Sequence, residues 1–225
     1  MRNRFALVVI AAALTGCSVL PSGSGQRESV RQAVRPSGPA YVPTVEGRQC
    51  LSKLGAAEAS FTPLPDKFYG AGCSTLNTVK LSALQSDTSN QFGLANLGPV
   101  ACPLATNFAA WARYGVDRAA RAVLGSPLAR IETMGSYNCR NIAGSAKRSA
   151  HSTANAIDVG AFVLADGRRI SVKQGWGGGS SAEKEFLRIV HTSACKRFGT
   201  VLGPNYNAAH QDHLHLENSG KSFCR

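Results

Sequence analysis

Apolar residues recur every three or four positions in two segments of the chain, which is the period of a helix that buries one face. In the first segment Pro103 suits the opening turn and Gly125 suits the stop. We expect a break at Gly115 and helix again over residues 117–124. The second segment covers residues 183–198. The apolar positions that carry the period are Leu104, Phe108, Trp111, Leu187, Val190, Ala194 and Phe198.

Other segments alternate apolar and polar residues, which is the period of a strand with one buried face. The turn sequence Ala165-Asp166-Gly167 separates two of them and predicts a β-hairpin. The glycine-rich segment 175–181 predicts a loop and lacks the Gly-Lys-Ser/Thr ending of a phosphate-binding loop. This mixture predicts an α+β fold, with a small antiparallel sheet flanked by helices. The expected strands are residues 78–81, 130–134, 156–163, 169–172 and 213–217.

The start of the chain has the features of an export signal. A positively charged start precedes the short apolar run 5–14, and Leu14-Thr15-Gly16-Cys17 resembles the bacterial lipobox. The apolar run is shorter than the roughly 18 residues of a membrane span. We therefore expect residues 1–16 to be a lipoprotein signal peptide and Cys17 to be lipid-modified. An ordinary signal peptide with an unrelated cysteine is the alternative.

Composition divides the rest of the chain into a tether and a domain. Residues 17–45 are rich in Ser, Gly, Pro, Gln and Arg and show no apolar period, which predicts a disordered tether. Residues 46–225 would form the folded domain. Ser18 resembles the sorting signal of outer-membrane lipoproteins. We expect a location in the bacterial cell envelope, lipid-anchored to the outer membrane and facing the periplasm.

The charge balance is strongly basic. Lys and Arg number 25 and Asp and Glu 13, so the formal net charge is +12, or 23 − 13 = +10 without the two arginines of the signal segment. A positive field favours anionic partners. For an exported protein we expect peptidoglycan or another anionic envelope polymer, and the membrane through the lipid anchor, rather than nucleic acid.

Six cysteines remain besides Cys17. An even number in an exported protein predicts disulfides, although the sequence does not choose among the pairings. We take as the expected pairs the cysteines that are neighbours in sequence. A cysteine metal site is disfavoured because no Cys-x-x-Cys pair occurs. The expected pairs are Cys50–Cys73, Cys102–Cys139 and Cys195–Cys224.

The five histidines include a candidate metal site. His151 is followed at short range by Asp158, with small residues between them. His213 and His215 project from one face of the expected last strand, because residues two apart on a strand share a face. His151 and Asp158, together with one of His213 and His215, would hold Zn²⁺ and leave its fourth position open. A structural hydrogen-bond cluster is the alternative. His191 lies on an apolar helix face and is expected to pack in the core.

These residues resemble the LAS metallopeptidases, which carry His-x-x-Gly-x-Ala-x-Asp followed by His-x-His. That group includes D-Ala-D-Ala carboxypeptidases, the penicillin-insensitive murein endopeptidase and the hedgehog domain. The resemblance implies an LAS/hedgehog-like zinc site of His151, Asp158 and His215. Ala154 departs from the pattern, which has Gly there. Residues 135–140 are similar to the Ser-Gly-Tyr-Arg segment of the carboxypeptidases, which makes Arg140 the candidate for substrate binding or polarisation.

The domain as a whole, from about Cys50 to Arg225, also resembles the bacterial extensin-like C-terminal domain family. The Cys-Arg elements, the helix around Phe186-Leu187-Arg188 and the segment Leu202-Gly203-Pro204 before the last histidines carry this resemblance. The peptidase interpretation rests on the metal motif rather than on this second resemblance.

The general base is left open by the sequence. The carboxypeptidases place a Glu just before the last ligand, whereas Asp212 stands three residues before His215. We rank His213 first, His210 second and Asp212 third. The resemblance implies a zinc-dependent peptidase acting on peptidoglycan, of D,D-carboxypeptidase or endopeptidase type. The alternatives are a non-catalytic zinc module that binds the cell wall and a structural lipoprotein with a decayed site.

Overall fold

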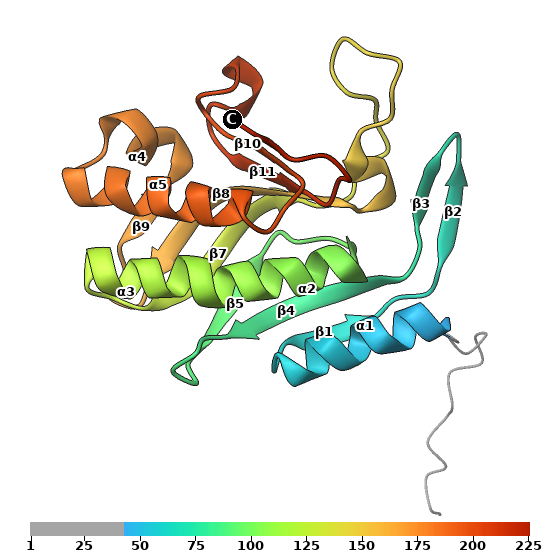
Figure 1. Ribbon diagram of the computed structural model, residues 1–225, viewed down its shortest axis with the longest axis horizontal. Coiled ribbons are helices and arrows are strands. Elements are labelled where there is room, and N and C mark those ends of the chain that lie inside the picture. The colour runs from blue at the N-terminus through green and yellow to red at the C-terminus, as the bar shows by residue number, and fades with distance from the viewer. Residues whose placement is uncertain (1–42) are drawn as a thin grey trace, which may run out of the picture. The chain divides into compact units, whose positions relative to one another are not determined.

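The computed structural model describes residues 43–225. Strands lie at the centre of the domain that these residues form (Figure 1). The predicted signal peptide, the lipidation site Cys17 and nearly all of the tether at 17–45 lie outside the described residues. The first element is helix α1 (Val45–Ala56), which is capped by Thr44 accepting from the backbone N–H of Gly47. The folded part therefore begins close to residue 45.

The main sheet has ten strands and is larger than the sheet expected from the sequence. It is also mixed, because β5 pairs with β7, and β10 with β12, in parallel. Parallel neighbours need a long crossover, and helices run between β5 and β7. The expectation of a small antiparallel sheet is therefore wrong in size and direction, while the α+β class is confirmed. In spatial order the strands are β1 (Ser60–Pro63), β4 (Thr78–Gln85), β5 (Gln91–Ala95), β7 (Leu128–Gly135), β8 (Ala156–Leu164), β11 (Leu214–Glu217), β10 (Thr200–Leu202) and β12 (Phe223–Cys224), with β6 (Val100–Ala101) on β4 and β9 (Arg169–Ser171) on β8.

A separate two-stranded sheet pairs β2 (Lys67–Gly70) with β3 (Cys73–Thr75). Each of the strand segments predicted from alternation lies wholly or largely within a strand. The predicted hairpin is confirmed as β8 and β9, whose turn contains Gly167 at φ +88°. A glycine adopts that conformation without the steric penalty of a side chain.

Helices α2 (Cys102–Trp111), α3 (Arg118–Leu124) and α5 (Ser181–Cys195) lie over one face of the main sheet (Figure 1). Their apolar stripes and the inward residues of the strands form the core. Leu104, Phe108 and Trp111 are completely buried, as their period predicted. Gly125 ends α3 in a left-handed conformation, again as predicted.

The break expected at Gly115 does not occur. A π-helical turn, η1 (Ala112–Asp117), joins α2 to α3 without interruption. Glycine serves packing here, because a Cβ at Gly115 would lie 2.2 Å from Oγ of Ser193 on α5. The missing side chain lets the two helices approach.

The loop expected over residues 175–181 is also wrong for most of its length. Helix α4 (Val172–Gly178) occupies it, capped by Ser171 accepting from the backbone N–H of Gln174. Trp176 is buried, and a Cβ at Gly175 would lie 2.8 Å from Cδ1 of Leu187. Tertiary packing therefore outweighs the low helix propensity of the glycines.

The last long helix, α5, matches its prediction to within a few residues. It begins with a capping box, in which Ser180 and Glu183 each satisfy a backbone N–H of the other. Its predicted apolar face is buried. Of the described helices, none is long and apolar enough to cross a membrane.

Two of the three expected disulfides are wrong. The structure pairs Cys50 with Cys102 and Cys73 with Cys139, at Cα–Cα distances of 6.0 and 5.6 Å. A disulfide requires Cα atoms in this range. The packing of α1 against α2 brings Cys50 to Cys102, although 52 residues separate them. The pair Cys195–Cys224 is confirmed.

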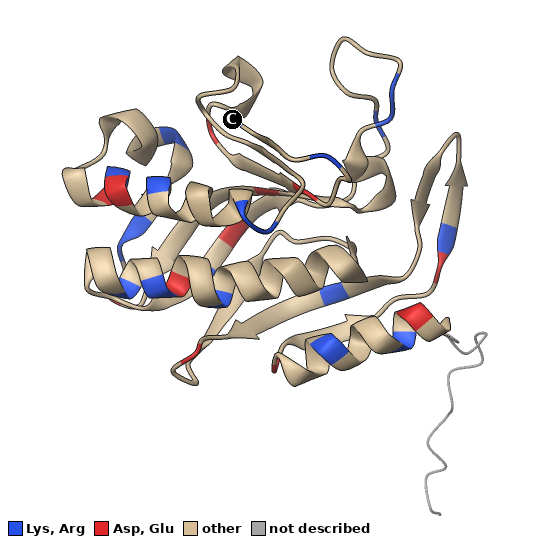
Figure 2. Ribbon diagram, in the orientation of Figure 1, with Lys and Arg blue, Asp and Glu red and all other residues tan. Residues whose placement is uncertain are grey.

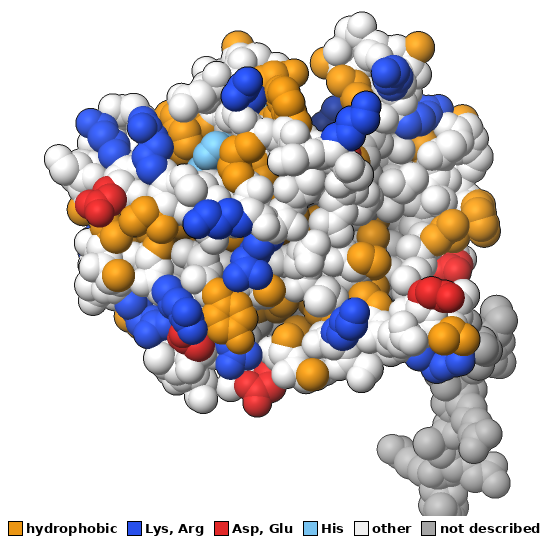
Figure 3. All heavy atoms as spheres, viewed as in Figure 1, with side chains coloured by type: hydrophobic (Ala, Val, Ile, Leu, Met, Phe, Trp, Pro, Cys, Tyr) orange, Lys and Arg blue, Asp and Glu red, His pale blue; other side chains and the backbone are white. Residues whose placement is uncertain are grey.

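Basic residues are spread over the described residues rather than confined to one element (Figure 2). On the face in Figure 3, Lys and Arg side chains alternate with apolar ones over the helices, and Asp and Glu are few. Some cations are paired, as Arg118 and Arg121 are with Asp87. The positive charge noted in the sequence therefore covers a broad surface.

Candidate metal centre

The three predicted ligands come from different elements and meet at one point. Asp158 on β8 and His215 on β11 are direct partners across the two strands. His151 lies in the short 3₁₀ helix η2 (Ala150–Thr153), just before β8. One ligand atom of each residue lies within 4.8 Å of the ligand atoms of the other two. The convergence expected from the sequence is observed.

The cluster lies on the face of the sheet that is turned away from α2, α3 and α5. Leu214 and Leu216 are completely buried in the core beneath those helices. Side chains alternate along a strand, so His213 and His215 project to the other side. Both histidines remain largely buried, at 9% and 8% exposure, because loops cover this face.

Hydrogen-bond partners fix which ring nitrogens face the cluster. His151 Nδ1 lies 3.1 Å from the carbonyl oxygen of Ser136, which only accepts, so Nδ1 carries the hydrogen. His215 Nε2 lies 3.3 Å from a carboxylate oxygen of Glu217 and likewise donates. In these tautomers His151 Nε2 and His215 Nδ1 both present lone pairs toward the carboxylate of Asp158. Three electron-pair donors at one point require a cation between them, either a proton or a metal ion.

The spacing of these donors fits zinc. The distances are 3.3 Å between His151 Nε2 and His215 Nδ1, 3.1 Å between His151 Nε2 and Asp158 Oδ2, and 2.9 Å between His215 Nδ1 and Asp158 Oδ1. Tetrahedral zinc with bonds of about 2.0–2.1 Å separates its ligand atoms by about 3.3 Å. Two imidazoles and one carboxylate also form a donor set that zinc takes in hydrolases. A proton shared by the three residues gives similar distances. A metal ion that binds here would therefore have to displace that proton.

The protonation of the cluster follows from burial and pairing. Burial by itself raises the pKa of Asp158, but the close contacts with the His151 and His215 imidazoles, which can share a proton with the carboxylate, outweigh it and hold that pKa well below the ordinary range. Burial lowers the pKa of His215, but the hydrogen bonds to Asp158 and Glu217 prevail and raise it to about 9. The carboxylate is therefore ionised across the neutral pH range and attracts a cation.

The short helix η2 holds His151 in place. The Ser149 side chain caps it by accepting from the backbone N–H of His151. At its other end Ala154 is buried and adopts φ +55°, in the left-handed region. This is the position where the metallopeptidase pattern has Gly. Glycine adopts such a φ without steric penalty, whereas alanine is strained by about 1–2 kcal/mol.

A cavity of about 390 Å³ adjoins the cluster. All of the predicted catalytic residues except Asp212 line it: Arg140 from the loop after β7, His210 from the short helix η3 (Ala208–His210), and His213. Its remaining walls mix polar and apolar side chains. These include Tyr206, Asn207, Leu202, Phe223 and Glu217.

The candidates for the general base differ in their surroundings. His213 Nδ1 lies 2.9 Å from Asp212 Oδ1, and its Nε2 lies 3.7 Å from Asp158 Oδ1, at the edge of the cluster. His210 Nδ1 lies 2.7 Å from the amide oxygen of Asn207. Burial and the neighbouring His213 and His215 lower the pKa of His210 to about 4. A carboxylate therefore supports His213, whereas only a neutral amide supports His210. Asp212 contacts the far side of His213 and does not line the cavity.

Two supporting groups were missed in the sequence. Glu217 could have been found, since it stands two residues after His215 and shares its face of β11. The Ser136 carbonyl gives no sequence signal, because every residue has one.

His191 was expected in the core but is only half-buried, and it lies outside the candidate centre. Trp111 was expected on the apolar face of a helix, and it is completely buried in the core.

The model of the extensin-like protein C-terminus family matches residues 48–225. The chain belongs to this family. The resemblance drawn from the sequence is confirmed to that extent, and the matched range contains all residues of the candidate centre. No curated protein and no solved structure matches the chain.

Proposed function

We propose that this domain is a zinc-dependent peptidase that cleaves peptide bonds in peptidoglycan, as a D,D-carboxypeptidase or an endopeptidase of LAS type. The observation that carries the proposal is the convergence of the lone pairs of His151 and His215 on the Asp158 carboxylate, beside an open cavity. The partners Ser136 and Glu217 orient both imidazoles for this purpose. Ligating histidines in metal sites almost always have such a partner on the outer ring nitrogen.

Zinc, when bound, would supply Lewis-acid polarisation and would lower the pKa of a bound water toward about 7. The chain's own residues would handle the proton and the substrate. His213 is our candidate to accept the proton at Nε2, since Asp212 holds the ring and stabilises its cationic form. Arg140 is our candidate to bind a substrate carboxylate at the mouth of the cavity.

The proposed substrate agrees with the cavity and the charge of the protein. Peptidoglycan stem peptides are short, extended and anionic, and the cavity combines one cation with imidazoles and apolar walls. The chain is basic, which favours an anionic polymer. The proposed location is the bacterial cell envelope, with the domain held by lipid on Cys17.

The test measures zinc content and products of purified peptidoglycan together. We expect one zinc ion per chain and release of D-Ala or cross-link peptides, detected by mass spectrometry. His213→Ala should keep the zinc and lower the hydrolysis rate by about 10²–10⁴-fold. His215→Ala should lose both. Arg140→Ala should keep the zinc and weaken substrate binding, whereas its control Lys53→Ala, which removes an exposed cation on α1, should change neither. Stoichiometric zinc with tight peptidoglycan binding and no product would instead support the non-catalytic wall-binding module.

A further inference from the structure

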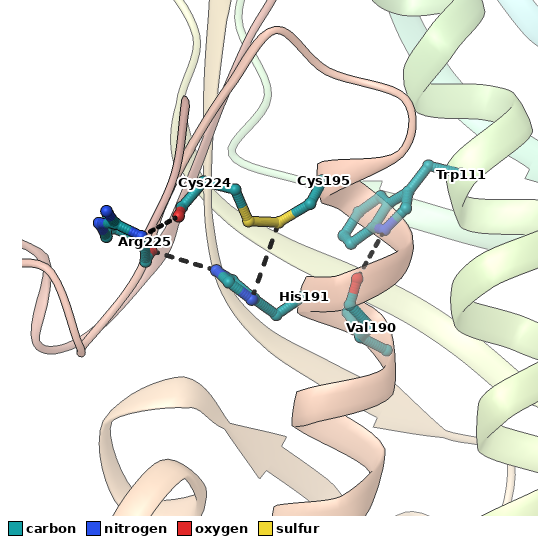
Figure 4. Close-up of a disulfide and its surroundings, with 6 residues drawn as sticks. All are labelled: Trp111, Val190, His191, Cys195, Cys224 and Arg225. Carbon is teal, nitrogen blue, oxygen red and sulfur yellow. Dashed lines mark hydrogen bonds between the residues drawn. A yellow bond between two sulfur atoms is a disulfide. The ribbon is translucent and has the colours of Figure 1, made fainter. Parts of the chain in front are cut away.

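A second group of ligand atoms lies away from the candidate metal centre. Cys195, at the end of α5, is bonded to Cys224 on β12, and His191 lies one helical turn before Cys195 (Figure 4). His191 Nδ1 is 3.9 Å from Cys195 Sγ. One ligand atom from each of the three residues lies within 4.8 Å of the others. Two sulfurs and an imidazole nitrogen form a donor set that zinc prefers.

The tautomer of His191 directs a lone pair toward the sulfurs. Its Nε2 lies 3.1 Å from the backbone oxygen of Arg225 (Figure 4). This oxygen can only accept, so Nε2 carries the hydrogen and Nδ1 is the free acceptor. A carbonyl or carboxylate oxygen on the outer nitrogen of a ligating histidine is the usual support in metal sites.

This disulfide differs from the other two. The half-buried Cys195 and Cys224 can be reached from solvent, whereas Cys50 and Cys102 are buried. Among residues 43–225, Cys73 and Cys139 belong to no cluster of three or more potential metal ligands, so no histidine accompanies that pair. Only the C-terminal pair therefore combines access with a neighbouring imidazole in the described part of the chain.

The backbone would keep the cysteines together after the sulfur–sulfur bond is broken. On β12 the N–H of Phe223 donates to Gly199 O at 2.8 Å, and that of Arg225 donates to Val201 O at 3.0 Å. The N–H of Gly203 donates to Arg225 O at 2.8 Å. These three bonds hold β12 on β10, the strand that follows α5 in the chain. The backbones of the two cysteines therefore stay close together when the sulfurs separate.

We propose that the Cys195–Cys224 disulfide is reducible in the folded protein and that its reduced form, with His191, binds a zinc-type divalent cation. The reductant is a dithiol. Its two thiols pass two electrons and two protons to the disulfide, which gives two cysteine thiols and one oxidised dithiol. Metal binding then releases two protons as Cys195 and Cys224 become thiolates. The oxidised protein lacks the site because its sulfurs bond to each other. This proposal is independent of the peptidase proposal.

The test compares the full chain before and after mild reduction, with Co²⁺ as the probe. Free thiols are counted, the reductant is removed without air, and Co²⁺ binding is followed by equilibrium dialysis and absorption. We expect two more free thiols and one more Co²⁺ per chain than in the oxidised protein, and a thiolate-to-cobalt charge-transfer band. The increment of one does not depend on whether the candidate metal centre also binds cobalt.

Variants test whether the charge-transfer band comes from Cys195, Cys224 and His191. Cys224→Ser should abolish it, and His191→Ala should weaken the extra Co²⁺ site by at least about tenfold. Cys73→Ser/Cys139→Ser should retain it. The wild type, measured with and without reductant, keeps the test independent of how the variants fold. The proposal is overturned if the pair resists reduction until the protein unfolds, if two additional thiols appear without extra cobalt, or if the band persists in Cys224→Ser.

Discussion

At the scale of single residues, His215 is the candidate ligand with the most charged neighbours. It lies between two carboxylates, Asp158 on Nδ1 and Glu217 on Nε2. Both partners stabilise the protonated ring, and its pKa is raised to about 9. A metal ion and a proton therefore compete for the same Nδ1 lone pair.

This competition predicts a pH-dependent zinc affinity. Below a pKa of about 9, His215 holds a proton that zinc must displace, so the affinity should fall about tenfold for each pH unit of acidification. Above that pKa the affinity should level off. Glu217→Gln removes one of the charges that raise the pKa, and should shift the plateau to lower pH. Competition with a calibrated chelator between pH 6 and 9.5 measures both. A zinc affinity independent of pH would contradict the assignment of Nδ1 as a ligand atom.

At the scale of elements, glycines decide how closely the helices pack. Gly115 in η1 lies against Ser193 of α5, and an added Cβ would lie 2.2 Å from Oγ and 3.0 Å from Cβ of that serine. Gly177 in α4 has no heavy atom within 4 Å of an added Cβ. Both glycines are helical, yet only the first is required by a neighbour.

Alanine at these two positions should therefore have opposite effects. We expect Gly115→Ala to lower the free energy of unfolding by about 1–3 kcal/mol through overpacking. Gly177→Ala should raise it by up to about 1 kcal/mol through helix propensity. Ser193→Ala in the Gly115→Ala background should recover part of the loss, since it removes the nearer atom. Urea denaturation measures all three. Equal destabilisation by both alanines would show that helix–helix approach is not the reason for Gly115.

At the scale of the whole molecule, the candidate centre joins segments that the core already holds. Its ligands come from η2, β8 and β11, and β8 and β11 also pair within the main sheet. Their inward residues Ile157, Val159, Leu214 and Leu216 are completely buried. The fold therefore does not depend on a metal ion for its core.

Zinc removal should lower stability without unfolding the domain. Zinc at about 1,000 times its Kd would stabilise the folded state by about 4 kcal/mol. At about 2–4 °C for each kcal/mol, a chelator should lower Tm by about 8–16 °C. His215→Ala should show no such shift. Differential scanning calorimetry gives Tm, and circular dichroism at 25 °C checks the fold. Complete loss of structure on chelation would instead indicate a metal that builds the fold.

The sequence by itself determined the elements with a strong local period and the chemistry of the candidate ligands. The apolar stripes of α2 and α5, the turn between β8 and β9, and the shared face of His213 and His215 are set by residues close together in the chain. The residue types of the candidate ligands could also be predicted, because imidazole and carboxylate side chains bind metal ions in any fold.

Only the tertiary structure decided what depends on contacts between distant residues. The parallel pairing of β5 with β7 follows from a long helical crossover, and the disulfides follow from how α1 packs on α2 and how β3 lies near Cys139. Helix α4 packs on α5, where Leu187 lies against Gly175. The orientation of the His151 ring comes from the Ser136 carbonyl oxygen, which lies 3.1 Å from Nδ1 and 15 residues away in the chain. Local patterns carry none of this, since pairing, close approach and polarity of surroundings are properties of the folded chain.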